Sequence, residues 1–467
     1  MRIIVTIAAS MALAGMALAG MALAACTGSD PVFGDSPTID EAGSETAATD
    51  GSVTNDAASV EAGGRPRMVD IGMGAFHGCA LGEDGSVWCW GSNGGGQLGD
   101  GSVGGDRPTA KRVGGLPTIA QLSVGLAHTC AVGNDHTIWC WGDNTKGKLS
   151  GDPGQDPLCG VVNCSATPRK VLGIVGKQVL ALAQTTCAIA SSGAVSCWGG
   201  NDTGLLGTGQ PIGVSSFVPV AVVGLETNAF QIGGGSWPGR SACVLSNAQQ
   251  VSCWGANMFA NLGHARGLGG DRDGGPDPAA PVYNPTPAAV TFPGGAVGPE
   301  EVVGNDTSCT VQLDNAVYCW GNEGCGQLAR PSDGGTGQPA PFRVSVAAAK
   351  RVRTGDATCV LLVDHGVSCW GDDANGLVGA PAGAACPTLG GGAGVEVSAP
   401  LMKPNLHGTA ITVGLWAAAV VDDDGYVLAW GKNSNGELGH ATGSSGDDDK
   451  ARNPIPRFVQ GLAPTTP

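Results

Sequence analysis

The chain has 467 residues, 80 of them glycine, and Asp plus Glu outnumber Lys plus Arg by 40 to 24. A formal net charge of −16 argues against the basic surface that nucleic-acid phosphates require, and it also disfavours electrostatic docking on anionic lipid. The length fits either two or three ordinary domains or one long array of repeats.

The first 25 residues have the pattern of an export signal. Arg2 precedes the apolar run IIVTIAASMALAGMALAGMALA, and residues 23–26 read LAAC. This ending resembles the lipobox of bacterial lipoproteins, which implies diacylglycerol transfer to the Cys26 thiol and cleavage just before it. Ordinary signal-peptidase cleavage after Ala24 is the alternative, because residues 22–24 also satisfy the small-residue rule.

The expected location follows from this signal. Thr27, instead of an aspartate after the lipidated cysteine, favours the outer membrane or cell surface in Gram-negative sorting. The alternative is a periplasmic or secreted protein. Residues 26–65 are rich in Ser, Thr, Asp, Glu, Gly and Ala, so they cannot bury enough apolar surface to fold, and we expect a disordered linker.

The rest of the chain is dominated by a repeat built around a Trp-Gly pair. Its clearest copies read WGSNGGGQLG, WGNEGCGQLA and WGKNSNGELG, and an aliphatic residue stands eight positions after each tryptophan. The tryptophans, which we expect in the core of each unit, are Trp90, Trp141, Trp198, Trp254, Trp320, Trp370 and Trp430. The aliphatic residues are Leu98, Leu149, Leu206, Leu262, Leu328, Val378 and Leu438.

Each repeat unit predicts short antiparallel strands. An aliphatic run such as IAQLSVG leads into HTCAV, then a polar turn, then TIWCWG. The turns carry Asp, Asn, Ser and Gly, which tolerate the dihedral angles of tight hairpins. No helical periodicity of comparable strength occurs, so the fold class is all-β with about four strands a unit.

Six units carry two cysteines ten positions apart, on either side of the hairpin turn. This places the two cysteines opposite each other on neighbouring antiparallel strands. Their Cα atoms should then be about 4.5–5.5 Å apart, which a disulfide can span. In the seventh unit both positions are alanine, Ala419 and Ala429, as expected when both partners of a bond are lost together. The predicted disulfides are Cys79–Cys89, Cys130–Cys140, Cys187–Cys197, Cys243–Cys253, Cys309–Cys319 and Cys359–Cys369.

Four cysteines remain after Cys26 and the hairpins are assigned. Cys159 and Cys164 share one loop, which favours a local bridge. Cys325 and Cys386 occupy loops of consecutive units and pair by elimination. An even remainder fits an oxidising compartment, in agreement with the export signal.

A further phrase recurs between units, as in TPRKVLG, VPVAVVGL and APFRVSV, and it precedes the first strand of the next unit. The first unit has no such phrase before it, whereas IPRFVQGL at residues 455–462 has no unit after it. We therefore predict a seven-bladed ring of four-stranded blades over residues 66–463, closed by the C-terminal strand joining the first blade, which removes both sheet edges.

The pattern WGxNxxGQLG after GxxHTCAL-like strands resembles the regulator-of-chromosome-condensation repeat family. This resemblance implies a seven-bladed β-propeller over about residues 66–463. The family's namesake activity, guanine-nucleotide exchange on a small nuclear GTPase together with chromatin binding, conflicts here with export, disulfides and negative charge.

The long insertions favour a binding function. Residues 150–167, 264–286, 380–403 and 440–453 all follow the same position of the repeat, so they should emerge on one face of the disc. Variable loops on a rigid scaffold are the usual site of recognition. We expect a lipid-anchored, monomeric scaffold that binds an envelope or extracellular protein or glycan, with no cofactor and no nucleic acid.

An envelope hydrolase or lyase with a pocket at the channel is the alternative. The chain has no HExxH, GxSxG or GxxxxGK[ST] motif, and fold alone assigns no function. Asp271, Asp273 and Asp277 are calcium candidates, whereas residues 422–424 and 447–449 fit turn chemistry and a solvated charge run.

Two further residue types have open roles. Trp237 and Trp416 fit buried packing better than exposed platforms for sugars. His77 and His128 fit buried hydrogen-bonding residues better than ligands to a metal.

Overall fold

The computed structural model describes residues 65–235, 240–273, 282–294, 296–331, 337–380, 384–387, 393–440 and 452–464. The expected signal, almost all of the linker and Cys26 lie outside this part. Within it, regular structure consists of strands and two short 3-10 helices, η1 (Thr145–Gly147) and η2 (Pro153–Gln155). None of the helices in the described residues has the length and apolar character needed to span a bilayer.

The strands form antiparallel sets that follow the chain order. The first set is β1 (Met68–Met73), β2 (His77–Gly82), β3 (Val87–Gly91) and β4 (Arg107–Arg112). The second is β5 (Ile119–Val124), β6 (His128–Gly133), β7 (Thr137–Asp143) and the first part of β9 (Val162–Ala181), with β8 (Leu158–Cys159) pairing beside it. The third is the last part of β9 with β10 (Thr185–Ala190), β11 (Val195–Gly199) and β12 (Ser216–Ala221).

The remaining sets repeat this order. The fourth is β13 (Ala229–Gly233), β14 (Ser241–Ser246), β15 (Val251–Ala256), β17 (Val282–Ala289) and the short β16 (Arg272–Asp273). The fifth is β18 (Pro299–Val303), β19 (Thr307–Gln312), β20 (Val317–Gly321) and β21 (Gln338–Arg343). The sixth is β22 (Ala349–Thr354), β23 (Ala357–Leu362), β24 (Gly366–Asp372), β26 (Ala393–His407) and the short β25 (Ala384–Pro387). The seventh is β27 (Ala410–Val413), β28 (Ala417–Val421), β29 (Val427–Gly431) and β30 (Asn453–Phe458).

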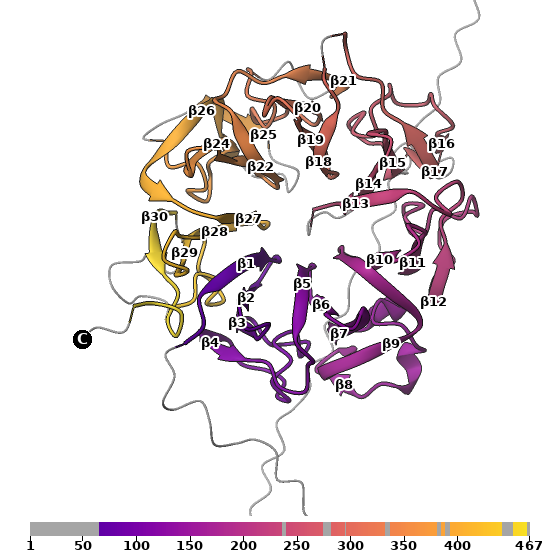
Figure 1. Cartoon of the computed structure of the whole chain (residues 1–467), viewed down its shortest axis with the longest axis vertical. Coiled ribbons are helices and arrows are strands. Elements are labelled where there is room, and N and C mark those ends of the chain that lie inside the picture. Colours follow the sequence, from indigo (N-terminus) through magenta and orange to yellow (C-terminus); the bar gives the residue numbers. More distant parts are fainter. Residues whose placement is uncertain are drawn as a thin grey trace, which may run out of the picture. The chain divides into compact units, whose positions relative to one another are not determined.

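These sets, called blades 1 to 7 below, are arranged in a ring around a common centre (Figure 1). The first strand of each blade is innermost, and the fourth lies at the periphery (Figure 1). The predicted all-β architecture of four-stranded antiparallel blades is confirmed. Blades 2 and 3 form one continuous sheet, because β9 pairs with β7 through residues 164–175 and then with β10 through residues 176–181.

The hydrophobic core is divided among the junctions between blades. Each of seven buried clusters draws its residues from two neighbouring blades, so every blade is covered on both faces. One of these clusters joins the last blade to the first and contains Met73, Trp90, Ala419 and Leu438. Packing of apolar side chains between blades therefore continues around the whole ring.

The predicted closure of the ring, in which the C-terminal strand joins the first blade, is wrong. β30 pairs with β29 and completes blade 7, while blade 1 obtains its outer strand from β4. The recurring phrase belongs to the blade before it, because it pairs with that blade's third strand. The sequence of β4, RPTAKR, does not indicate a strand, because it is largely polar and only Ala110 is buried, as an outermost strand can be.

Side-chain packing and hydrogen bonds between the first and last blades close the ring instead. The amide of Met68 donates to the carbonyl of Gly425 at 3.0 Å, and the amide of Ala110 donates to Gln460 at 2.9 Å. The guanidinium of Arg65 donates to the carbonyl of Ala463 at 2.8 Å, so the two ends of the ring meet.

Candidate functional site

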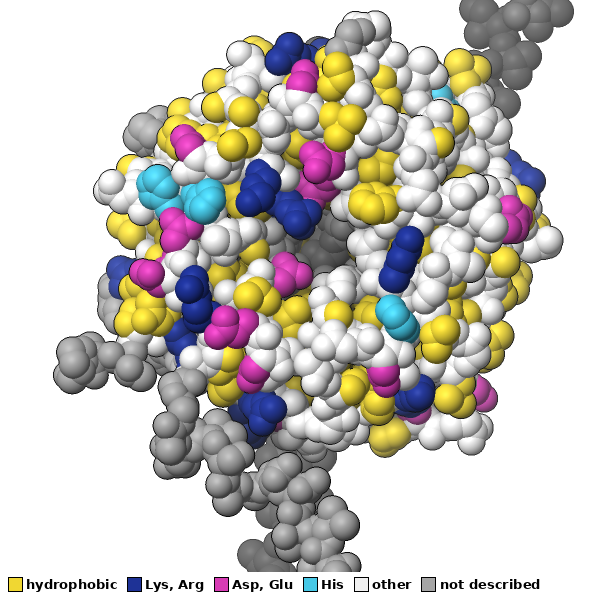
Figure 2. Space-filling view, in the orientation of Figure 1, with side chains coloured by type: hydrophobic (Ala, Val, Ile, Leu, Met, Phe, Trp, Pro, Cys, Tyr) yellow, Lys and Arg dark blue, Asp and Glu magenta, His cyan; other side chains and the backbone are white. Residues whose placement is uncertain are grey.

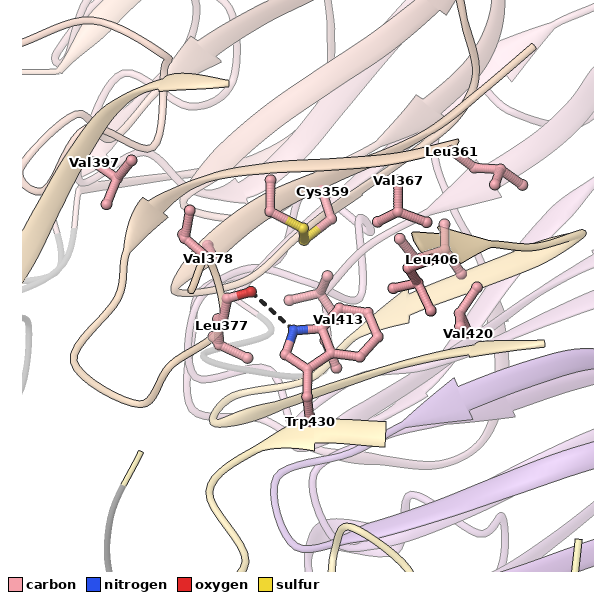
Figure 3. Packing of buried hydrophobic residues seen from close by; sticks show 14 of the residues in the cluster. Cys359, Leu361, Val367, Leu377, Val378, Val397, Leu406, Val413, Val420 and Trp430 are labelled. Carbon is pink, nitrogen blue, oxygen red and sulfur yellow. Dashed lines mark hydrogen bonds between the residues drawn. A yellow bond between two sulfur atoms is a disulfide. The ribbon is translucent and has the colours of Figure 1, made fainter. Parts of the chain in front are cut away.

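The tryptophan of each repeat fastens its blade to the one before. All seven tryptophans are fully buried, and each indole nitrogen donates to the backbone carbonyl of the residue seven positions after the preceding blade's tryptophan. Figure 3 shows this bond between Trp430 and Leu377. The seven pairs are Trp90–Glu437, Trp141–Gln97, Trp198–Lys148, Trp254–Leu205, Trp320–Asn261, Trp370–Gln327 and Trp430–Leu377, with distances of 2.8–2.9 Å.

The acceptor carbonyls lie in a loop that its own side chains hold in place. In six blades an Asn or Asp three positions after the tryptophan accepts a hydrogen bond from the amide of the aliphatic residue. These pairs are Leu98–Asn93, Leu149–Asn144, Leu206–Asn201, Leu262–Asn257, Val378–Asp373 and Leu438–Asn433, at 2.7–3.2 Å. Gly99 follows with a φ of +67°, and a Cβ there would lie 2.7 Å from the indole nitrogen of Trp141.

The same loops define one face of the ring. They join the third and fourth strands of each blade, and neighbouring third strands run in the same direction, so all seven loops emerge on one side, the loop face. The opposite side, the hairpin face, carries the turns between second and third strands. The insertions at 150–167, 264–286, 380–403 and 440–453 belong to or adjoin these loops, although parts of the last three lie outside the described residues.

Two disulfides brace the loop face. Cys159 and Cys164 close the β8–β9 hairpin in the blade 2 loop, with Cα atoms 5.8 Å apart. Cys325 and Cys386 join the loops of blades 5 and 6 across 61 residues, with Cα atoms 5.4 Å apart. The six hairpin disulfides lie inside the blades, between second and third strands, at Cα separations of 4.0–4.1 Å. Ala419 and Ala429 face each other at the equivalent register of blade 7.

The channel contains a ring of side chains that sequence analysis missed. The residue two positions before the first-strand partner of each blade's first hairpin cysteine, or of Ala419 in blade 7, lines the channel. These seven residues form the channel ring: Asp70, Gln121, Gln178, Gln231, Glu301, Arg351 and Ala410. They contribute to a cavity of about 460 Å³ lined by all seven innermost strands. Figure 2 looks onto one end of this channel, where acidic and basic side chains gather beside the opening.

Four members of the channel ring are clamps, by which we mean that their side chains hydrogen-bond to the backbone of the next blade's innermost strand. The carboxamide of Gln121 accepts from the amide of Val179 at 2.9 Å and donates to its carbonyl at 3.1 Å. Gln178 makes the same pair of bonds to Ile232, at 3.0 and 3.1 Å. Gln231 accepts from the amide of Val302 at 2.8 Å, and the remaining clamp is Glu301. The repeated pair of a polar residue followed by an aliphatic one was the available signal in the sequence.

Charge is balanced in this part of the channel. The Glu301 carboxylate accepts from the amide of Val352 at 2.9 Å and from the guanidinium groups of Arg353 and Arg351 at 2.8 and 3.3 Å. Burial raises the pKa of the Asp70 carboxyl, while the charges of Arg353 and Arg351 lower it. Acidic and basic groups therefore occur together here.

A second ring surrounds the channel at the loop face, where the turns between first and second strands lie. The residue just before each second strand forms this mouth ring: Phe76, Ala127, Gln184, Arg240, Asp306, Asp356 and Trp416. Each of their carbonyls accepts from the amide of the residue that follows the repeat's Trp-Gly pair, at 2.8–3.1 Å. The backbone of the mouth ring is therefore the same in every blade, while its side chains differ.

The mouth ring has an acidic part and an aromatic part. Asp306 and Asp356 lie on blades 5 and 6, and burial raises the pKa of their carboxyls to about 6 and about 7. On blades 7 and 1, Trp416 and Phe76 make an edge-to-face contact with ring centroids 5.3 Å apart. The ammonium of Lys432 lies 3.8 Å from the centre of the Trp416 ring.

The calcium and histidine candidates have structural surroundings. The carboxylate of Asp271 accepts from Asn257, His264 and Gly267 at 2.8–2.9 Å and so holds its own insertion together. Asp273 is exposed, and Asp277 lies outside the described residues. His77 and His128 are buried and hydrogen-bond through Nε2 to threonine hydroxyls of the next blade, both at 2.9 Å.

The other candidates divide between turns and undescribed segments. The Asp422 carboxylate accepts from the amides of Asp424 and Tyr426 at 3.0 and 2.7 Å, as in a tight turn. Trp416 is partly buried in the mouth ring. Trp237 and residues 447–449 lie outside the described residues.

Part of the repeat region matches one family of known proteins. Two family models, both described as the regulator of chromosome condensation (RCC1) repeat, match residues 68–97 with 119–148 and residues 84–132 with 424–466. The ultraviolet-B receptor UVR8 of Arabidopsis thaliana is 28% identical over 267 residues, which cover 56% of this chain and 54% of UVR8. The mouse E3 ubiquitin-protein ligase HERC2 is 26% identical over 212 residues, 42% of this chain but 4% of HERC2. The chain thus spans about half of one relative and a small part of the other.

Solved structures show the same fold. Yeast RCC1 (Prp20) bound to Kap60 superposes with a TM-score of 0.62 at 19% identity, covering 80% of this chain and 83% of Prp20. Human WBSCR16 gives a TM-score of 0.62 at 20% identity, covering 80% and 94%. At these identities the likeness concerns the fold alone.

Proposed function

We propose that this chain, a ring of regulator of chromosome condensation repeats, is a protein-binding module that acts outside the cytosol. Its loop face would contact the partner, and lipid on Cys26 would hold it to a bacterial membrane. The closed ring supplies a rigid frame, because indole and carboxamide bonds join successive blades. A rigid frame lowers the entropy lost when its loops bind a partner.

The tip of the blade 2 loop carries the proposal. Leu158 and Val161 flank Cys159 at this tip, and they are 70% and 96% exposed. The Cys159–Cys164 disulfide holds them on a closed hairpin. Large apolar side chains, exposed yet fixed in position, suit the apolar centre of a protein interface better than the polar surface of a glycan.

Two other observations support the proposal. Eight disulfides fit an oxidising compartment. Proteins of similar fold bind proteins: yeast Prp20 has been crystallised with Kap60, and a study of Prp20p describes its binding to Gsp1p and histones. Those partners belong to Prp20, and only protein binding as a mode is extended to this chain.

Crosslinking in intact envelopes tests the partner class. Full-length protein with a photoreactive residue in place of Gln155, beside the tip, should give one discrete protein adduct. The double variant Leu158→Ser/Val161→Ser should lose it. Val363→Ser, which changes a 51% exposed valine in a turn of the hairpin face, should keep it. Specific binding on a glycan array with no protein adduct would favour the glycan alternative and contradict the proposal.

Metabolic labelling tests the anchor separately. Radioactive palmitate should label the wild-type chain, and the Cys26→Ala variant should lose the label and leave the membrane fraction. Label that persists in this variant would contradict lipidation at Cys26, while the binding proposal would stand on the crosslinking result.

A further inference from the structure

We infer that the acidic part of the mouth ring is a binding site for a cationic side chain, a lysine ammonium or arginine guanidinium that the protein partner inserts between Asp306 and Asp356. This inference rests on the proposed function, because it names the chemistry with which the partner engages the loop face. It concerns two carboxylates that contribute to none of the bonds holding the blades together.

The buried carboxylate of Asp306 is the first observation that supports this site. Its residue is only 4% exposed, and neither carboxylate oxygen has a hydrogen-bond partner. Folded proteins almost always pair a buried carboxylate, because removing its charge from water costs free energy that hydrogen bonds must return. Its backbone, by contrast, follows the ring pattern, since its carbonyl accepts from the amide of Asn322 at 2.8 Å. The unpaired group is therefore the side chain, at a mouth-ring position whose residue type differs between blades.

The position of Asp356 is the second observation that supports it. It occupies the equivalent position on the next blade, and the charge of Asp306 acts on it directly. The two residues thus lie near each other, on the turns between first and second strands at the loop face. The other charged groups that act on the two are Arg240 on blade 4 and Asp372 at the end of β24. The Asp372 carboxylate already accepts from the amides of Ala374 and Val395, both at 2.9 Å.

The geometry favours an organic cation over a metal ion. In the described part of the chain, the ligand atoms of Cys325, Asp372 and Cys386 form the single group of three close enough to share an ion, and both cysteines are in a disulfide. Asp306 and Asp356 have no third ligand beside them there. An ammonium or guanidinium carries several N–H donors and can satisfy two separated carboxylates without a complete coordination shell.

The neighbouring blades already show that the mouth accepts such a group. The ammonium of Lys432 sits 3.8 Å from the centre of the Trp416 ring, and Trp416 is supported edge-to-face by Phe76. An intramolecular cation thus occupies the aromatic part of the mouth ring. At the acidic part, the charge of Arg240 on blade 4 acts on Asp306, but no ion pair or hydrogen bond joins the two side chains in the described residues. Two neighbouring carboxylates attract a further cation.

Titration with small cations tests the inference without requiring the partner. The probe is n-propylammonium, which resembles the end of a lysine side chain, and the control is tetramethylammonium, which has the same charge but no N–H donor. Thermal unfolding of the full-length chain is followed at pH 8 with equal concentrations of either chloride salt. Propylammonium should raise the unfolding midpoint more than tetramethylammonium does.

Variants and pH locate the effect. The difference between the two cations should vanish in Asp306→Asn/Asp356→Asn and persist in Asp202→Asn, which removes an exposed loop-face carboxylate paired with Lys146 at 3.7 Å. Loss of one charge-assisted hydrogen bond should weaken propylammonium binding about tenfold in either single variant. At pH 5 the difference should also disappear, because both carboxyls, with pKa values of about 6 and about 7, are then protonated.

The outcomes separate the two proposals. Equal shifts with both cations, or a difference that survives in the double variant, would overturn the cation site. Such a result would leave the crosslinking at residues 158 and 161 unaffected. Conversely, a cation effect confined to Asp306 and Asp356 in a chain that forms no protein adduct would support the site and contradict the partner.

Discussion

The channel ring and the mouth ring each take one residue from the same position of every repeat, yet the charged groups of the two rings have different surroundings. In the channel ring, Glu301 has two arginines and a backbone amide as partners, and three glutamines join neighbouring strands. In the mouth ring, the carboxylate of Asp306 has no hydrogen-bond partner, and the carboxyl of Asp356 lies near the like charges of Asp372 and Asp306. The channel ring stabilises the fold. The mouth ring keeps two buried or neighbouring carboxylates that destabilise the fold but can bind a cation.

The largest expected effect comes from breaking the channel ring. Glu301→Ala removes the acceptor of Val352 and leaves Arg351 and Arg353 facing each other, and it should lower the free energy of unfolding by about 3 kcal/mol. Urea unfolding at pH 7 measures this. Glu300→Ala, one position earlier on β18 and exposed, should change it little. Equal losses of unfolding free energy in both variants would mean that the bonds of Glu301 to blade 6 do not stabilise the fold.

The second effect, at the mouth, should have the opposite sign. Asp306→Asn should raise the free energy of unfolding by about 2 kcal/mol at pH 8, because the buried carboxylate has a folded pKa of about 6 against an ordinary value of 3.8. A carboxyl with a raised pKa binds its proton more tightly in the folded chain, so wild-type stability falls as pH rises through 6. The gain should therefore be absent at pH 4, and urea unfolding at both pH values checks it. A gain that is the same at pH 4 and pH 8 would contradict the assignment.

Two glutamines of blade 3, one in each ring, allow a direct comparison of how much the two rings stabilise the fold. Gln178→Ala removes both bonds to Ile232 and should cost about 1 kcal/mol, since water in the channel replaces part of what is lost. Gln184→Ala, in the mouth ring of the same blade, should leave the unfolding free energy unchanged. Chemical denaturation of the two variants side by side makes the measurement, and a larger loss at Gln184 would reverse the distinction between the rings.

The smallest effect is expected at the aromatic part of the mouth. Lys432→Ala removes the ammonium above Trp416 and should cost about 0.5 kcal/mol, as for a partly exposed cation–π contact. Tryptophan fluorescence and thermal unfolding report it, with the exposed Lys350→Ala as control. A loss several times larger would assign Lys432 a structural role that the distance alone does not indicate.

Sequence patterns predicted the parts of the fold that depend on side-chain type at fixed spacing. The cysteines ten apart and the buried tryptophans, such as Trp141, carry such a signal. The closure of the ring carries no such signal. The phrase in the first part of β9 runs directly into the inner strand of the next blade, and the polar β4 does not resemble a core strand. Assigning strands to blades requires pairing, which spacing alone does not provide.

The candidate site was less predictable for a physical reason. The acceptors of the tryptophan bonds are backbone carbonyls, such as that of Gln97, and every residue type has one. The mouth ring is defined by its backbone, so its side chains vary from Ala127 to Trp416 and form no motif. Only the glutamine clamps are visible in the sequence, where each is a polar residue directly before an aliphatic one.

The spacing of the sulfur bridges bears on how the chain matures. Each hairpin bridge spans 10 residues and the β8–β9 bridge spans 5, so these can form as soon as a short stretch of chain reaches an oxidant. The Cys325–Cys386 bridge spans 61 residues and needs the loops of two finished blades side by side. Seven bridges thus depend only on local chain order, whereas the eighth depends on the correct packing of blades 5 and 6 against each other.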